Sequence, residues 1–179
     1  MNDAELTANI KRGDREAARE LVRRHYASVL RFLTMLCRNA DDADELTQET
    51  FLRALNRVGQ FRGHSGLRTW LHSIAYHEFT HRRRKQRPES VLTDHATSCP
   101  FETTSALAID LGCALRSIPE DARAVFVLCD VQELTMEEAA TVLRIPTGTV
   151  KSRLRAARKQ LMALLEPEQE VNLNVSRTR

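Results

Sequence analysis

The sequence is poor in the residues that build β-sheets and disulfide-rich folds. Aromatic side chains make up 5% of the 179 residues, and the chain has six glycines and five prolines. Its four cysteines, Cys37, Cys99, Cys113 and Cys129, form neither a CxxC pair nor a metal-finger spacing. The composition therefore argues against a β-sandwich, a disulfide-stapled secreted domain and a zinc finger.

Long apolar runs and period-two alternation are also missing. No run approaches the roughly 20 apolar residues of a membrane-spanning helix, and the N-terminal MNDAELTANIKRGD has no signal-peptide core. We therefore expect a cytoplasmic chain whose thiols stay reduced. Because nothing alternates long enough to form a strand, the expected class is all-α.

Charge is abundant, but it is segregated along the chain. Residues 41–49 hold five acids and no base, residues 82–87 five bases and no acid, and residues 144–159 six bases and no acid. Blocks of opposite sign favour separate partners, with a polyanion for the basic blocks and a different partner for the acidic one. The alternative for each block is a solvated helix face.

Apolar spacing of three and four predicts helices along most of the chain. Residues 4–36 carry this periodicity, and a second helix starts near residues 39–42 and ends near Gly59. A third helix is expected from Leu67 to Gln86, where Pro88 stops it.

Two small helical domains joined by a flexible linker follow from this pattern. Residues 88–106 lack periodicity and hold two prolines, so they divide a domain at 1–87 from one at 107–165. Fully extended, this linker reaches at most ~60 Å. Residues 166–179 have no pattern and are expected to fray.

The second domain contains the pattern of a helix-turn-helix. Thr135 and Glu138 form a capping box for a short helix, a turn follows at residues 144–146, and a basic helix starts at Thr147 or Gly148. Its outward polar side chains suit phosphates and base edges in the major groove. The alternative is a structural helix pair in a bundle. The residues expected to face DNA are Thr149, Lys151, Ser152, Arg153, Arg155 and Arg158.

Residues 77–81, HEFTH, match the HExxH pattern of zinc proteases, with His77 and His81 as ligands and Glu78 as general base. No third ligand follows at a known spacing, and the five bases of residues 82–87 oppose a bound cation. We therefore expect no metal. A basic helix face for nucleic acid and a plain polar helix face are the two other interpretations.

The loop FRGHSG, residues 61–66, precedes this helix and offers an aromatic ring, a histidine and two glycines. Such a loop can form a pocket for an unstacked base, although Phe61 could also fill the core, as could Trp70. The acidic stretch DDADELTQETFLRAL shows no sign of the pocket that catalytic carboxylates need. It is more typical of a protein-docking surface.

In this order the segments resemble the extracytoplasmic-function (ECF) sigma factors of bacterial RNA polymerase, which have regions 2 and 4 of the sigma-70 family only. The resemblance covers roughly residues 5–87 and 107–165. DELTQETFLRAL is similar to the segment that docks on polymerase, and FRGHSGLRTWLHSIA is similar to the loop and helix that capture the flipped −10 base. IPEDARAVFVLCDVQELTMEEAATVLRIPTGTVKSRLRAAR is similar to the −35-reading domain, and GTVKSRL is its most specific phrase.

The resemblance implies a sigma factor that binds core polymerase and promoter DNA, initiates transcription of a specific regulon, and is held by an anti-sigma factor. It implies that the protein is not an enzyme and needs no cofactor. The docking residues implied are Asp44, Glu45, Gln48, Glu49, Phe51 and Arg53. The −10 residues implied are Phe61, Arg62, His64, Ser65, Arg68, Trp70, Tyr76, His77, Arg82 and Arg83.

The sequence departs from the family pattern at three positions. His77 stands where the family often has asparagine, His81 where it often has aspartate, and Ala156 where it often has arginine. One rival hypothesis is a stand-alone helix-turn-helix regulator with residues 1–87 as a sensing or dimerisation domain. The other is the zinc hydrolase.

Overall fold

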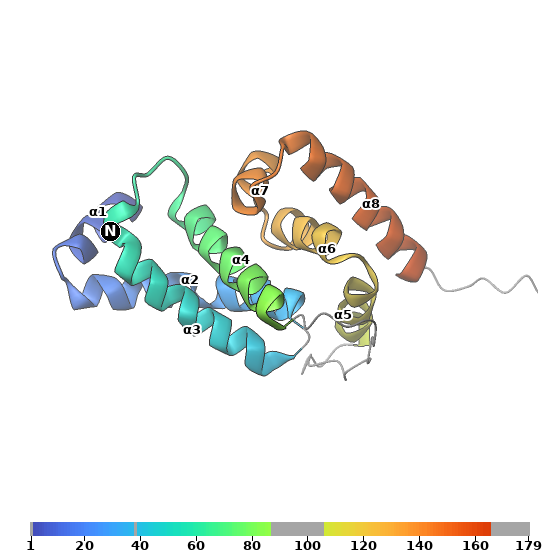
Figure 1. The fold of residues 1–179 in the computed structure, drawn as a ribbon, viewed down its shortest axis with the longest axis horizontal. Coiled ribbons are helices and arrows are strands. Elements are labelled where there is room, and N and C mark those ends of the chain that lie inside the picture. The colour runs from blue at the N-terminus through green and yellow to red at the C-terminus, as the bar shows by residue number, and fades with distance from the viewer. Residues whose placement is uncertain (1, 38, 87–105, 166–179) are drawn as a thin grey trace, which may run out of the picture.

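A computed structural model describes residues 2–37, 39–86 and 106–165, and within these ranges every regular element is helical (Figure 1). The all-α prediction is therefore confirmed. The expected linker up to residue 105, with Cys99, and the expected frayed tail lie outside the described residues. The elements are α1 (Asp3–Lys11), α2 (Arg15–Leu36), α3 (Ala40–Arg57), the 3-10 turn η1 (Val58–Gln60), α4 (Leu67–Gln86), α5 (Ala106–Ser117), α6 (Glu120–Phe126), the π-helical turn η2 (Val127–Val131), α7 (Met136–Leu143) and α8 (Thr147–Leu165).

The first domain consists of α1 to α4, in which α2, α3 and α4 pack against one another. Its core is built from side chains that are almost fully buried, among them Leu21, Phe32 and Leu71. The prediction of one continuous helical stretch over residues 4–36 was wrong. Gly13 has a φ of +87° that L-residues rarely adopt, and Asp14 caps a new helix by accepting from the backbone amides of Glu16 and Ala17.

The second domain consists of α5 to α8, and its local signals are confirmed. The Thr135 hydroxyl accepts from the amide of Glu138, whose carboxylate accepts from the amide of Thr135, so the capping box is complete. Arg144 ends α7 in the left-handed region with a φ of 56°. The buried side of α8 is formed by Val150, Leu154, Ala157 and Leu161.

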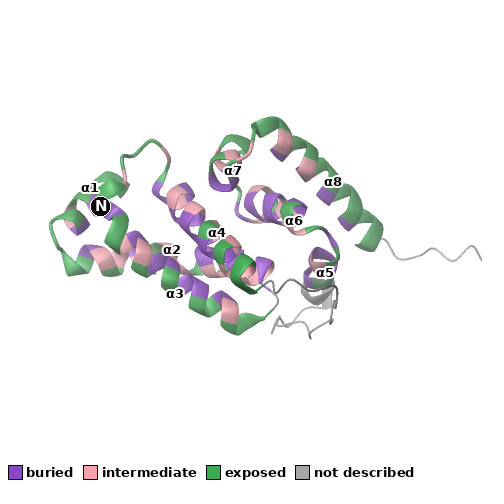
Figure 2. Cartoon of the chain, viewed as in Figure 1, coloured by how far each residue is buried: buried purple, intermediate pink, exposed green. Residues whose placement is uncertain are grey.

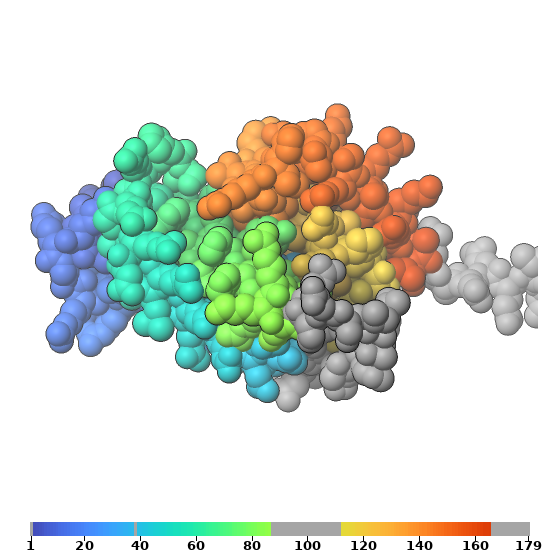
Figure 3. Space-filling view, viewed as in Figure 1, coloured from blue at the N-terminus to red at the C-terminus, as the bar shows by residue number. Residues whose placement is uncertain are grey.

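The two domains pack directly on each other through α4 and α7 (Figures 1 and 3). One apolar cluster runs without interruption from Leu6 in α1 to Leu154 in α8, and buried residues line both sides of the seam (Figure 2). Among the described helices, none is long and apolar enough to cross a membrane.

Candidate nucleic-acid and protein-docking surfaces

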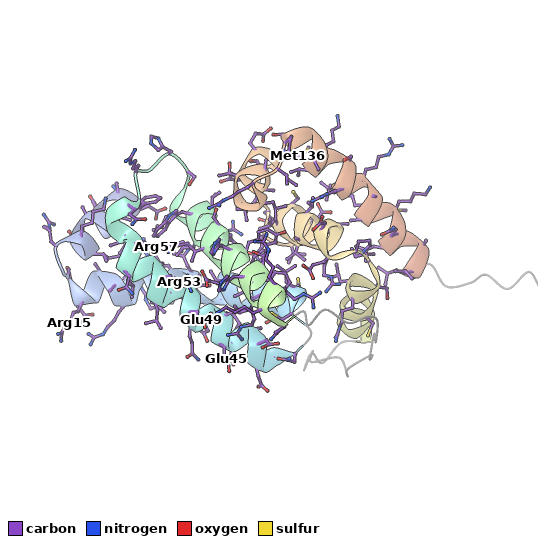
Figure 4. The ribbon with its side chains drawn as sticks, viewed as in Figure 1. Arg15, Glu45, Glu49, Arg53, Arg57 and Met136 are labelled. Carbon is purple, nitrogen blue, oxygen red and sulfur yellow. The ribbon has the colours of Figure 1, made fainter. Side chains whose placement is uncertain are left out.

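The exposed side of α3 carries a regular series of charges. Glu45, Glu49, Arg53 and Arg57 follow one another at intervals of four, so they line up along the helix from acidic to basic (Figure 4). Acids near the N-terminus and bases near the C-terminus complement the helix dipole. The acidic first half of α3 is therefore stabilised by the dipole of the helix itself.

Three further exposed side chains complete this surface, which we call the α3 face. Asp44 and Gln48 are exposed beside the charge series. Leu52 is 63% exposed and adds an apolar side chain to this surface. Phe51, one of the implied docking residues, lies instead in the core, where its ring stacks on Tyr26 with centroids 6.0 Å apart.

Arg82 projects from α4 onto the α3 face. Its guanidinium lies 3.1 Å from the Asp42 carboxylate, 2.8 Å from that of Glu45 and 3.4 Å from that of Glu49. Burial opposes its charge, but the hydrogen bonds that Arg82 donates to the carboxylates of Glu45 and Asp42 outweigh this and raise the pKa of Arg82. Arg82, which the resemblance assigns to the −10 element, is thus paired with acids of α3 in this structure.

The central residue of HEFTH has a structural partner. Glu78 is 2% exposed, and its carboxylate lies 3.0 Å from the guanidinium of Arg53 and 3.1 Å from the Nδ1 atom of His77. The rings of His77 and His81 stack in parallel with centroids 6.3 Å apart. Among the described residues no group of three potential ligands could hold a metal ion. Glu78 therefore joins α4 to α3, which leaves it unavailable as a general base.

The loop at residues 61–66 leads into α4 and is held at its start. The Phe61 ring lies 5.2 Å from that of Trp70, and Lys11 donates to the carbonyl oxygen of Phe61 at 3.0 Å. Both rings are half-buried and pack against the core. Arg62 and His64 are exposed, and Ser65 is half-buried.

The implied −10 residues do not form a single pocket. The 20 residues of α4 span about 30 Å, so the loop with Trp70 lies at one end and Arg82 and Arg83 at the other. His77 is exposed, whereas Tyr76 and Arg68 are half-buried. The structure therefore separates a loop site from a basic end of the helix.

The exposed side of α8 presents cations opposite its buried side. Lys151, Arg155 and Ser152 are exposed, and neither Lys151 nor Arg155 has an ion-pair partner among the described residues. Thr149 is half-buried at the helix start, where its amide donates to the carbonyl oxygen of Pro146. Unpaired cations on a solvent face are suited to a polyanion.

Two other arginines of α8 are engaged by acids of the same domain. Arg153 lies 2.8 Å from the carboxylate of Asp121, and Arg158 pairs in bidentate fashion with Asp130 at 2.8 and 2.5 Å. Hydrogen bonding to Asp130 raises the pKa of Arg158. Sequence reasoning missed both acids because they lie 28 or more residues away and outside the basic block.

Two family models match the chain in the same order as these surfaces. Residues 21–89 match Sigma-70 region 2, and residues 108–161 match Sigma-70, region 4. The RNA polymerase sigma-H factor of Pseudomonas aeruginosa is 30% identical over 182 residues, covering 92% of this chain and 94% of that relative. The ECF RNA polymerase sigma factor SigM of Mycobacterium tuberculosis is 34% identical over 166 residues, covering 92% and 85%.

Solved structures agree with these relatives. The sigma factor RpoE, solved with the anti-sigma factor NepR from Bartonella quintana, has a TM-score of 0.74 at 26% identity and covers 84% of this chain and 98% of its own. CnrH, solved with the cytosolic domain of CnrY, has a TM-score of 0.72 at 25% identity, covering 91% and 96%. The chain belongs to the sigma-70 family and, within it, to the ECF sigma factors. This family consists of transcription initiation factors, not enzymes.

Proposed function

We propose that the chain binds core RNA polymerase, directs it to promoters with −10 and −35 elements, and acts in the cytosol. The observation that supports this most directly is the exposed cationic side of α8 within the segment that matches region 4. Residues 107–165 then read the −35 element, and residues 1–87 dock on polymerase and read the −10 element.

The α3 face is the proposed docking surface. It combines exposed acids and an amide with Leu52, which is the mixture that a protein partner recognises. Arg53 and Phe51 support this surface from within, because Arg53 pairs with Glu78 and Phe51 fills the core beneath it. The contacting residues proposed are Asp44, Glu45, Gln48, Glu49 and Leu52.

The loop at residues 61–66 is the proposed −10 site. Arg62 and His64 are exposed there for the DNA strand, and the Phe61–Trp70 pair offers aromatic edges to an unstacked base. His77 lies farther along α4, where it is exposed and is proposed to contact the same strand. Its imidazole replaces the amide that the family often has, so we propose a different base preference at that contact.

We also propose that an anti-sigma factor controls the chain. RpoE was solved with an anti-sigma factor, and a groove of about 690 Å³ lies between the two domains of this chain. Its lining includes Phe79 and Arg83 from the first domain and Ile118 and Arg123 from the second. A segment inserted there would contact both domains at once.

Transcription with purified components tests the proposal. The chain is added to core polymerase on genomic DNA of the host, and the RNA 5′ ends are mapped against core polymerase alone. The expected result is a set of new start sites that share two upstream motifs. Sequence-specific duplex binding by the free chain without new start sites would instead support the stand-alone regulator.

A further inference from the structure

We propose that Asp130 is a positioning residue that sets the DNA specificity of α8, because its carboxylate withholds Arg158 from DNA phosphates. This inference rests on the proposed function, since it concerns how the proposed −35-reading surface selects its DNA. It is supported by the placement of the cations on α8, by the geometry of the Asp130–Arg158 pair and by the charge that this pair cancels.

Three cations of α8 lie along one side of the helix. Lys151, Arg155 and Arg158 follow one another at intervals of four and three residues, which brings their side chains onto successive turns of the same face. All three residues are exposed. A polyanion that runs along this side of α8 therefore passes all three positions.

Of these three cations, only Arg158 has an ion-pair partner among the described residues. Its Nε atom donates to the Oδ2 atom of Asp130 at 2.8 Å, and its Nη2 atom donates to the Oδ1 atom at 2.5 Å. The carboxylate thus cancels the charge at one of the three positions and leaves the charges of Lys151 and Arg155 available.

Asp130 holds Arg158 in the way that a phosphate would. A guanidinium binds carboxylate and phosphate oxygens in the same bidentate manner, through two parallel N–H donors. The carboxylate of Asp130 already accepts from both donors on the Nε edge of Arg158. A DNA phosphate that approaches this edge must displace the carboxylate, which then remains as an unpaired anion close to the DNA backbone and repels it.

The pair lies at the surface, where its effect on binding exceeds its effect on stability. The side chain of Arg158 is 56% exposed, whereas that of Asp130 is 23% exposed. The guanidinium is therefore open to solvent, while its partner carboxylate is mostly covered. Because exposed ion pairs contribute little to folding, the main consequence of this pair is expected in the interaction with DNA.

The π-helical turn η2 supplies the carboxylate. The amide of Gln132 donates to the carbonyl oxygen of Val127, five residues earlier, at 2.8 Å. Such wide turns are uncommon and frequently occur at functional sites. Asp130 is the acid of this turn and lies 28 positions before Arg158 in the chain. The turn thus places an acid beside the basic helix.

Cancelling one charge lowers the affinity for DNA of any sequence. Each cation that neutralises a phosphate releases counterions and adds about 0.9 to the slope of log affinity against log salt concentration. The neutral Asp130–Arg158 pair adds nothing to this slope. A genome offers a large excess of non-promoter sites, so one withheld phosphate contact leaves more of the chain for promoters.

Binding to duplex DNA without promoter elements tests this role. Asp130→Asn keeps the shape of the side chain but removes its charge, so Arg158 becomes available to phosphates. Fluorescence anisotropy between about 50 mM and about 200 mM salt should show a slope steeper by about 0.9 and, at the lower salt concentration, about tenfold tighter binding. Asp130→Asn/Arg158→Ala should restore the wild-type slope, and Asp130→Glu should keep it.

Glu137→Gln is the matched control. It removes the charge of an exposed acid in the same domain that has no ion-pair partner among the described residues, so it should keep the wild-type slope. In transcription with core polymerase, excess non-promoter duplex should inhibit Asp130→Asn at a concentration about tenfold lower than it inhibits the wild type. Circular dichroism verifies that every variant keeps the helical content of the wild type.

An unchanged slope in Asp130→Asn, or an equal increase in Glu137→Gln, would overturn the role of Asp130, as would a slope that stays steep without Arg158. Lys151→Ala/Arg155→Ala separates this failure from that of the proposed function. If this variant has a shallower slope while Asp130→Asn matches the wild type, only the role of Asp130 fails. If its slope is also unchanged, α8 does not contact phosphates, and the proposed −35 reading fails as well.

Discussion

At the scale of single residues, Glu78 shows how far a local pattern depends on its surroundings. The sequence HEFTH offers a general base between two metal ligands, but the structure buries the carboxylate and pairs it with Arg53. An ion pair between neighbouring helices cannot be recognised from the sequence of either helix alone. Arg53 and Glu78 lie 25 positions apart, in two helices whose apolar periodicities are independent. The zinc-hydrolase hypothesis depended on a free Glu78, and the structure removes that condition.

Glu78→Gln should lower the free energy of unfolding by about 2 kcal/mol. The variant leaves Arg53 without its carboxylate partner, and the loss stays below that of a fully buried pair because Arg53 is partly exposed. Urea denaturation followed by circular dichroism measures the change. Glu16→Gln breaks a pair on the exposed surface and should stay within about 0.5 kcal/mol of the wild type. Equal stabilities of the two variants would contradict the structural role.

His72 should make the protein less stable as the pH falls below about 6.5. Burial lowers the pKa of its imidazole from 6.5 to about 4, so the unfolded chain binds a proton that the folded chain rejects between these values. Stability is then fully present above the unfolded pKa. It should decrease by roughly 2 kcal/mol between pH 7 and pH 4.5 from this group alone.

The measurement is urea denaturation across this pH range for the wild type and His72→Phe. Carboxylates contribute to both proteins, so the informative quantity is the difference between the two slopes. A smaller slope in the variant is expected, because phenylalanine does not titrate. Identical slopes would show that His72 is protonated without penalty in the folded protein.

At the scale of elements, sequence patterns located most helices because their signals are local. The predicted helix from Leu67 to Gln86 is confirmed at both ends. The capping box at Thr135 was predictable because its two members are three residues apart. The break at Gly13 was missed because apolar spacing continues across it, and η2 was missed because a single wide turn barely alters the periodicity.

The exposed side of α8 should contribute directly to promoter recognition. Arg155→Ala should weaken use of the −35 element by about 1–3 kcal/mol if the guanidinium contacts a base edge. Competition between promoters that differ only in the −35 element measures this effect in transcription assays. Gln160→Ala, an exposed uncharged position on the same helix, is the control. Equal losses on all promoters would assign Arg155 to phosphate instead.

The α3 face should determine the affinity for polymerase without affecting the fold. Asp44→Lys/Gln48→Lys changes two exposed side chains and leaves the Arg82 pairs intact, because those use Asp42, Glu45 and Glu49. Binding to core polymerase, measured by fluorescence anisotropy, should weaken at least tenfold, whereas Glu16→Lys on α2 should bind as the wild type does. Wild-type affinity in the double variant would place the docking surface elsewhere.

At the scale of the whole molecule, the sequence predicted two helical domains but not their packing. Ser28 and Gln132 are separated by 104 positions, and each looks like an ordinary polar residue at a helix or turn. Arg83 looked like part of a DNA-binding block until Glu120 was found beside it. Such pairings depend on how the two helical domains meet, which no local periodicity encodes.

Salt should separate the closed packing from DNA binding. The interdomain contact includes an apolar cluster and the neutral hydrogen bonds between Ser28 and Gln132, which salt screens little, so the radius of gyration should change little between about 50 mM and about 200 mM salt. Binding of the α8 surface to duplex DNA should weaken steeply over the same range, because counterions are released from phosphates. X-ray scattering and anisotropy titrations at matched salt concentrations measure both. Expansion of the free chain at high salt would show that ion pairs such as Arg83–Glu120 dominate the packing.

The partnership between Ser28 and Gln132 also limits how freely the two halves can be exchanged between sigma factors. A hybrid that combines residues 1–87 of this chain with a −35-reading domain from a relative keeps only the first domain's half of the interdomain contact. Unless the incoming domain supplies an amide at the place of Gln132 and a carboxylate at the place of Glu138, Ser28 and Thr69 lose their partners. Such hybrids would differ in basal output even when each half reads its own promoter element correctly.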